Sequence, residues 1–256
     1  MTRRLVFAGE RQAEGLVAFL GRLLRYDRGA AVRLRAAPGT AGGGAALAVF
    51  GHAPALEVIV VRTVLLAAAE AAELDETVSA GQLAEAVDAA AGTGDTAEVA
   101  VALPGPVSGP GWAGLLPPRG GWEPVAGLPG PAELYVAVAT GVAEFKARVE
   151  ALPEEKRTRT EVDRIGGDIW SRPLDGTPLP LRAAHAARVF GLLPPPPAPP
   201  GTPAPAPAAP AAGPSAGSAA EPALLAAGNW LRLRTPYGSV AVRRTGGLGR
   251  LGVTPL

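Results

Sequence analysis

The sequence predicts an α+β fold in which a central mixed or antiparallel sheet is covered by helices. The first observation is a pair of apolar runs, residues 46–50 and 56–66, separated by Gly-His-Ala-Pro, a pattern typical of a hairpin. In the longer run both alternating sets of side chains are apolar, so this strand must be covered on both faces. The third observation is helical periodicity in residues 131–192, which predicts a helical part after the sheet.

The elements before the hairpin follow from the same periodicities. Residues 5–7 predict a short strand, and residues 11–25 predict a helix with one apolar stripe. The stripe consists of Leu16, Phe19, Leu20, Leu23 and Leu24. In residues 31–35 apolar side chains alternate with Arg33 and Arg35, as expected for a half-exposed strand.

The elements after the hairpin are a helix and a further strand. Ser79 and Gln82 fit a capping box, which predicts a helix over residues 80–91. Residues 67–77 are Ala-rich and acidic and are assigned no element, whereas residues 96–103 alternate as a strand does.

Residues 104–131 predict a loop, because their eight prolines and eight glycines disfavour both helices and strand ladders. Trp112 and Trp122 make this loop too apolar for a free linker. Either the tryptophans pin an ordered loop to the folded body, or they form the lip of a binding pocket.

Three helices are expected in the last part of the body. Pro131 opens the first, whose apolar stripe continues to residue 152. The second follows Pro153, and Gly166 and Gly167 together cost roughly 2 kcal/mol in a helix interior, so a break there is expected. The third covers residues 181–190, and the body ends at residue 192.

The chain then changes composition. Residues 193–222 contain twelve prolines and predict a disordered Pro/Ala linker. Residues 223–256 predict a small β-hairpin module, in which Leu231 and Leu233 would oppose Val240 and Val242. A two-stranded hairpin is marginal in water, so it needs a surface from its own body or from a partner.

Composition excludes several classes of site. The chain has no cysteine and two histidines, which excludes disulfides, thiol catalysis and cysteine-ligated metals. We expect no cofactor. We also expect no membrane span, because prolines interrupt the long uncharged stretch 99–118. A cytoplasmic location is expected because the first residues lack a signal-peptide pattern.

Charge is distributed unevenly along the chain. Residues 1–192 carry a net charge of −3, whereas residues 223–256 hold five arginines and no acid. The hairpin could dock on the acidic body, contact nucleic acid through arginines and aromatic rings, or bind another protein. The candidate contacts are Trp230, Arg232, Arg234, Tyr237, Arg243 and Arg244.

No catalytic constellation is evident. His185 stands between two arginines on a predicted helix, where nearby positive charge would lower its pKa, but a structural histidine is the simpler interpretation. The acids of residues 161–175 lack a spacing that would fix two of them beside a nucleophile. The sequence therefore names no catalytic, cofactor-binding or metal-binding residue.

Residues 112–122 and the sequence Ile-Trp-Ser-Arg-Pro at 169–173 resemble the uncharacterised proteins common in high-GC actinobacteria. This resemblance covers residues 1–192 and implies no activity. We therefore expect a non-catalytic intracellular interaction or adaptor protein, whose tethered hairpin finds its partner by charge or by β-addition. The alternatives are a nucleic-acid accessory protein and a small-molecule enzyme that uses the tryptophan loop as a lip.

Overall fold

The computed structural model describes residues 3–38, 45–67, 74–91, 98–194 and 221–244. Within these residues five α-helices accompany a ten-stranded sheet. The helices are α1 (Glu10–Tyr26), α2 (Ala80–Ala91), α3 (Pro131–Glu150), α4 (Arg159–Trp170) and α5 (Leu181–Val189). The strands are β1 (Arg4–Phe7), β2 (Ala31–Pro38), β3 (Ala45–Ala53), β4 (Val58–Leu66), β5 (Asp75–Ser79), β6 (Val99–Ala102), β7 (Glu123–Val125), β8 (Ala223–Ala227), β9 (Trp230–Thr235) and β10 (Gly238–Arg243).

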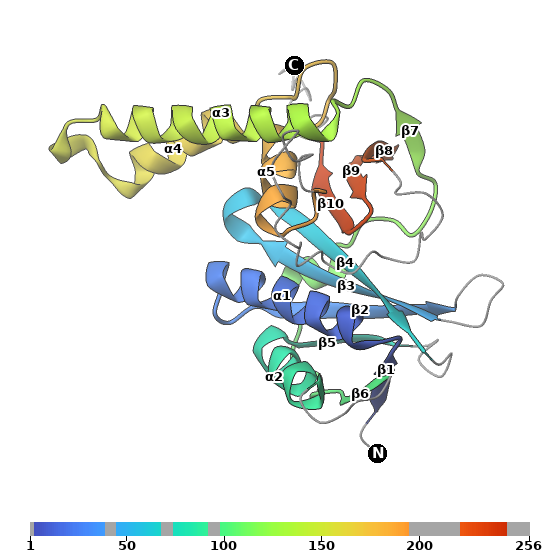
Figure 1. Ribbon diagram of the computed structural model, residues 1–256. Coiled ribbons are helices and arrows are strands. Elements are labelled where there is room, and N and C mark those ends of the chain that lie inside the picture. The colour runs from blue at the N-terminus through green and yellow to red at the C-terminus, as the bar shows by residue number, and fades with distance from the viewer. Residues whose placement is uncertain (1–2, 39–44, 68–73, 92–97, 195–220, 245–256) are drawn as a thin grey trace, which may run out of the picture.

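The sheet is antiparallel at every strand pair in the described residues. Its main path is β5-β2-β3-β4-β10-β9-β8-β7, and β1 connects β4 to β6 beside this path. The α+β class with an antiparallel sheet is therefore confirmed. Figure 1 shows α1 and α2 against the lower strands, while α3 and α4 project together from the upper part of the molecule.

The central hairpin is formed by β3 and β4, as expected, but its connection lies later than predicted. Strand β3 continues through Gly51 and His52 to Ala53, because these residues pair with Val60, Ile59 and Val58. The turn is a short 3₁₀ helix at Pro54–Leu56, followed by Glu57 at a φ of 51°. The sequence underestimated β3 because glycine and proline were both assigned to the turn.

One face of the sheet, here called the helix face, carries the main core. The β4 side chains of Val58, Val60 and Val64 point to this face and are buried. Helices α1 and α5 contact β4, and α5 also contacts β9 and β10. Helix α2 packs on α1 and reaches β5 and β6. These helices cover one of the two faces of the doubly apolar strand.

The C-terminal hairpin is part of this sheet. Strand β10 lies between β4 and β9, with Val240 opposite Val60 on one side and Leu233 on the other. The predicted opposition of Leu231 and Leu233 to Val240 and Val242 is confirmed, and the register pairs Leu231 with Val242 and Leu233 with Val240. Strand β8 extends the hairpin to three strands and pairs with β9. The greater part of the predicted linker, residues 195–220, lies outside the described residues.

The turn of this hairpin is anchored to β4. The Arg62 side chain is buried on the helix face, and its Nη1 donates a 2.8 Å hydrogen bond to the Tyr237 carbonyl oxygen. Burial and the charge of Arg22 lower the pKa of Arg62 to about 10. Gly238 has a φ of 149°, and a Cβ there would collide with the Val61 carbonyl oxygen. The close approach of β10 to β4 therefore requires glycine at this position.

Helices α3 and α4 form a helical hairpin that packs on α5. A Cβ at Gly141 of α3 would lie 2.8 Å from the Leu181 side chain and 3.1 Å from the Trp170 ring, so glycine permits this close packing. The expected break at Gly166 and Gly167 is wrong, because α4 continues through both residues to Trp170. Tertiary packing against α3 compensates for the weak helix propensity of two glycines.

Strand β5 was missed because its sequence, Asp-Glu-Thr-Val-Ser, has little β propensity. It is held by the exposed edge of β2, where Val32 pairs with Val78, and by arginines that pair with its acids. The other expected strands and helices are present within a few residues of their predicted bounds.

Candidate functional site

The face of the sheet opposite the helices is covered by the loop of residues 104–122, and we call it the loop face. Side chains alternate along a strand, so Ile59 and Val61 of β4 point to this face while Val60 points to the core. With Trp230 of β9 and Ala241 of β10 they form a second apolar cluster. The loop residues Trp112, Leu116 and Trp122 pack against this cluster.

Both tryptophans of the loop are half-buried and hold it on the sheet. The Trp122 indole N–H donates a 3.0 Å hydrogen bond to the Pro118 carbonyl oxygen, and its ring lies 5.6 Å from the Arg232 guanidinium. The Trp112 ring stacks on His52 of β3 at a centroid distance of 5.8 Å. The loop is therefore ordered by contacts from its own aromatic side chains.

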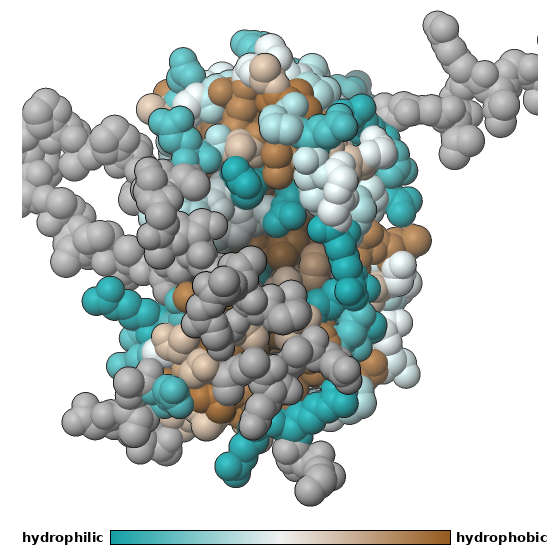
Figure 2. Space-filling model, turned by 90° about the vertical axis from the view of Figure 1, so that its right-hand side faces the viewer, coloured by the Kyte–Doolittle hydropathy of each residue, from teal (hydrophilic) through white to brown (hydrophobic). Residues whose placement is uncertain are grey.

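A cavity of about 260 Å³ lies between this loop and the sheet. We call it the loop-face cavity. Figure 2 shows a hollow with an apolar floor on this side of the molecule, bordered by hydrophilic side chains. The lining residues come from five strands of the sheet (β2, β3, β4, β10 and β9) and from the loop: Arg35, Ala36, Ala46, Ala48, Phe50, Val61, Thr63, Pro117, Pro118, Arg119, Arg232 and Ala241. Three arginines thus border an otherwise largely apolar space.

Two of these arginines contact one carboxylate. The Nε of Arg35 donates to Asp75 Oδ1 at 2.9 Å, and Arg119 Nη2 lies 3.6 Å from Asp75 Oδ2. Arg33, outside the cavity, also donates to Oδ1 at 2.7 Å. Burial alone would raise the pKa of Asp75, but hydrogen bonds and charges from Arg33 and Arg35 lower it on balance. Asp75 is therefore ionised at neutral pH and shared among three cations.

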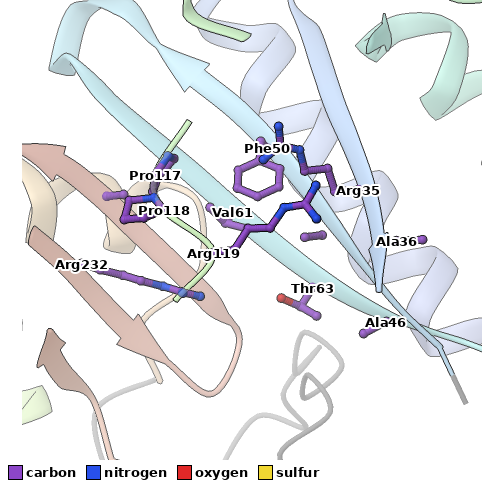
Figure 3. A pocket seen from close by; sticks show the side chains of 12 residues that line it. Arg35, Ala36, Ala46, Phe50, Val61, Thr63, Pro117, Pro118, Arg119 and Arg232 are labelled. Atoms are coloured by element: carbon purple, nitrogen blue, oxygen red, sulfur yellow. The ribbon is translucent and has the colours of Figure 1, made fainter. Parts of the chain in front are cut away.

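Arg232 is placed differently. Its Nε donates a 2.9 Å hydrogen bond to the Ser239 hydroxyl, and its guanidinium stacks over Trp122. Among the residues that the structure describes, no carboxylate lies within ion-pair distance of it. Burial, and then the nearby Arg234, lower the pKa of Arg232, yet an arginine stays protonated at neutral pH. Its Nε is the donor used in the bond to Ser239, and Figure 3 shows the side chain extending toward the cavity.

The other candidates of the hairpin have diverse surroundings. Trp230 is buried in the loop-face cluster, and the exposed Arg243 stacks over its ring at 5.2 Å. Tyr237 is half-buried at the turn, whereas Arg234 and Arg244 are exposed. The structure brings together Trp122 and Arg232 of the predicted sets, and it places Trp112 against His52. Neither tryptophan is among the residues that line the cavity.

Sequence reasoning missed Arg35, Arg119 and Phe50. Arg35 belongs to an alternating strand whose outward side chains were expected to be in solvent, and its guanidinium lies 5.9 Å from the Phe50 ring. Arg119 lies in the predicted loop, and nothing in the sequence indicated an ion pair between it and Asp75. The available signal was charge alternating with apolar residues on a strand near the sheet centre, but only the strand order brings it opposite Arg232.

The residues weighed for catalysis make structural contacts. His185 stacks on Trp170 at 4.4 Å, and burial, followed by the charge of Arg188, lowers its pKa. Asp168 pairs with Arg148 and Arg164, so it belongs to the ion pairs that join the helices of the α3–α4 hairpin.

Two searches for specific sites gave negative results within the described ranges. No group of three histidines or acids is arranged to hold a metal ion there. In that same part of the chain no helix has the length and apolar character that a membrane crossing requires.

A larger groove of about 790 Å³ lies between α4 and the turn after β3. Trp170 and Phe145 form its aromatic wall, and Arg182 pairs with Glu57 across one end at 2.9 Å. The charges of this groove are mutually compensated, so it favours no ligand as clearly as the loop-face cavity does.

Comparison with known proteins gave two matches and no named relative. A family model described as "Domain of unknown function (DUF8185)" matches residues 117–247, and a second, described as "Domain of unknown function (DUF8010)", matches residues 1–114. Neither a curated protein nor a solved structure matches the chain. The two matched segments meet in the loop-face loop, and both contribute to the cavity lining.

Proposed function

The chain belongs to the DUF8185 family of unknown function, and we propose from its own geometry that it is a non-catalytic binding protein for a small organic anion. The uncharacterised family expected from the sequence is thereby confirmed. The proposed binding site is the loop-face cavity. The observation that carries the proposal is Arg232, a partly buried guanidinium that borders an apolar cavity without a carboxylate partner in the described structure.

Electrostatics supports an anionic ligand. Burying a charge is costly unless an opposite charge compensates it, and Arg232 is stacked and hydrogen-bonded only to neutral groups. An arginine whose Nε is fixed by Ser239 presents its remaining N–H groups in a rigid fork that suits carboxylate or phosphate oxygens. A bound anion would therefore supply the missing counter-charge.

The lining supports binding more than catalysis. Its polar groups are three arginines and the Thr63 hydroxyl, whereas general acid–base chemistry at neutral pH needs a group that titrates near that pH. The position of the cavity, at the junction of two matched segments, is a common place for ligand sites. Its volume of about 260 Å³ lies just below the usual range of roughly 300–1,000 Å³, so we expect a small ligand.

Thermal unfolding of the full chain tests this proposal. Carboxylates, phosphate monoesters and sulfonates of small size are compared with their neutral amide or alcohol analogues at physiological ionic strength. A ligand present at one hundred times its Kd stabilises by about 2.7 kcal/mol. For a protein of this size that corresponds to a rise in Tm of roughly 5–10 °C. We expect this rise with at least one anion and with no neutral analogue.

Two arginine variants localise the effect. Arg232→Gln should abolish the anion-dependent rise in Tm, measured against its own ligand-free value. Arg234→Gln is the matched control, because Arg234 lies two residues away on the same strand but is exposed. Stabilisation by neutral analogues, or equal responses of the two variants to every anion, would refute the proposal.

The interaction role expected for the hairpin needs a different mechanism. In the described structure β10 pairs with β4 and β9 pairs with β8, so β-addition to this hairpin would have to displace one of these strands. A partner could still contact the exposed Arg234, Arg243 and Arg244. Nucleic-acid binding, a cytoplasmic location and an actinobacterial origin stay predictions.

A further inference from the structure

The cationic groups of the loop-face cavity lie at two separate ends. Arg35 comes from β2 and Arg232 from β9, and the sheet order places β3, β4 and β10 between these strands. Neighbouring strands lie about 4.8 Å apart, so four spacings separate the two backbones by roughly 19 Å. Figure 3 shows the two side chains extending into the cavity from opposite sides. The guanidiniums therefore face one apolar floor from either end.

Arg119 strengthens the end that contains Arg35. Both side chains reach Asp75, at 3.6 Å and 2.9 Å respectively, and Figure 3 shows the Arg119 guanidinium close to Arg35. Asp75 is also shared with Arg33 at 2.7 Å, so one negative charge serves three positive charges. This end therefore keeps a net positive charge, while the Arg232 end has no carboxylate among the described residues.

The floor between the two ends is apolar. It is formed mainly by Ala48, Phe50, Val61 and Ala241, and the Thr63 hydroxyl is the one uncharged side-chain group of the lining that can hydrogen-bond the middle of a ligand. A polar group buried there without a partner would cost free energy, so an apolar middle is favoured. A volume of about 260 Å³ corresponds to about nine groups of water size, at roughly 30 Å³ each.

We infer, on the basis of the proposed binding function, that the ligand is a short organic dianion with one anionic oxygen group at each end and an apolar middle. One end binds the Nη groups of Arg232. The other end binds Arg35 and Arg119, which Asp75 orients and partly neutralises. Asp75 is thus a positioning residue that also competes with the ligand for these two arginines.

The test measures affinities of defined probes for the full chain by isothermal titration calorimetry. The probes are unbranched dicarboxylates of four to eight carbons, monocarboxylates of the same lengths, and alkyl phosphates, which carry two charges at a single end. We expect the best dicarboxylate to bind at least 10-fold more tightly than the monocarboxylate and the alkyl phosphate of equal length. A preference for the alkyl phosphate would overturn the inference by showing that total charge, and not its separation, decides.

Two variants distinguish the ends of the cavity. Arg119 is highly exposed, so Arg119→Gln should fold normally. Arg119→Gln should lower the affinity for the dicarboxylate toward the affinity for the monocarboxylate. The affinity for the monocarboxylate should not change, because this probe is expected to bind at Arg232. Asp75→Asn should raise dicarboxylate affinity at least about 3-fold, because Arg35 and Arg119 lose their competing anion. Asp88→Asn, at an exposed acid of α2 outside the cavity, is the matched control.

The outcomes separate this inference from the proposed function. Equal binding of mono- and dicarboxylates, lost in Arg232→Gln but unchanged in Arg119→Gln and Asp75→Asn, would overturn the two-ended ligand and leave anion binding intact. If no probe binds and the wider anion panel also fails, both are refuted.

Discussion

Leu233→Ala tests whether the C-terminal hairpin is an integral part of the folded body. Leu233 is completely buried on the helix face, opposite Val240 of β10 and Leu224 of β8. The substitution removes three carbon atoms, worth about 2.4 kcal/mol at roughly 0.8 kcal/mol per buried group. The cavity left behind adds about 1 kcal/mol, because paired strands on both sides prevent collapse. We therefore expect a loss of about 3.5 kcal/mol.

Urea unfolding measures this loss by tryptophan fluorescence and by circular dichroism. Trp230 lies in the hairpin and Trp122 packs against it, whereas Trp112 and Trp170 lie in the remaining structure, so fluorescence follows both parts. Both signals should shift together in Leu233→Ala, because one cooperative transition includes the hairpin. The expected decrease in Tm is roughly 7–14 °C.

Arg234→Ala is the control for this experiment, since it alters an exposed residue of the same strand. Its free energy of unfolding should stay within about 0.5 kcal/mol of the wild type. If Leu233→Ala also stays within that limit, or if it loses only a separate minor transition, the hairpin does not contribute to the core and the reasoning is wrong.

Three further predictions concern packing, pH and nucleic acid. Gly141→Ala should destabilise by about 1–3 kcal/mol through overpacking, whereas Gly167→Ala, with nothing within 4 Å of the added Cβ, should stabilise α4 by up to about 1 kcal/mol; urea unfolding compares them. Burial lowers the pKa of His52 and His185, so the folded state binds fewer protons and stability should fall as the pH drops below about 6.5. Thermal unfolding between pH 7 and 5.5 checks this, and replacing both histidines by phenylalanine should flatten the profile; an unchanged slope would contradict it. In electrophoretic shift assays at physiological salt we expect no binding of generic DNA or RNA; a shift that disappears when the exposed hairpin arginines become glutamine would instead favour nucleic-acid binding. Those arginines are Arg234, Arg243 and Arg244.

Local patterns were sufficient for most of the fold. Helix α1 buries one face and strand β4 buries both faces. In each case the spacing of apolar residues within a short segment is enough to predict the element. The break predicted at Gly166 and Gly167 was wrong because the low helix propensity of glycine is a weak effect compared with the packing of α4 against α3. Strand β5 was missed because its pairing depends on arginines of β2 that lie about forty residues earlier in the chain.

The candidate site was less predictable. Arg232 and Trp122 were singled out from composition, but their contact joins residues more than one hundred positions apart and follows from strand order. Arg35 looked like an ordinary exposed strand residue, and nothing nearby in sequence distinguished it from Arg33. A cavity between a loop and a sheet depends on long-range pairing, which periodicity does not encode.

The insertion of β10 beside β4 has a consequence for how the chain acquires its structure. Val61 of β4 pairs with Ser239 of β10, which is synthesised much later. This edge of β4, the most apolar strand, therefore stays unpaired until β10 has been synthesised. Such an open edge invites intermolecular strand pairing, and long sequence separation slows closure. Cutting the chain between residues 114 and 117 would leave each fragment with an unmatched strand, so we expect the pieces to be recovered as soluble protein only when they are produced together.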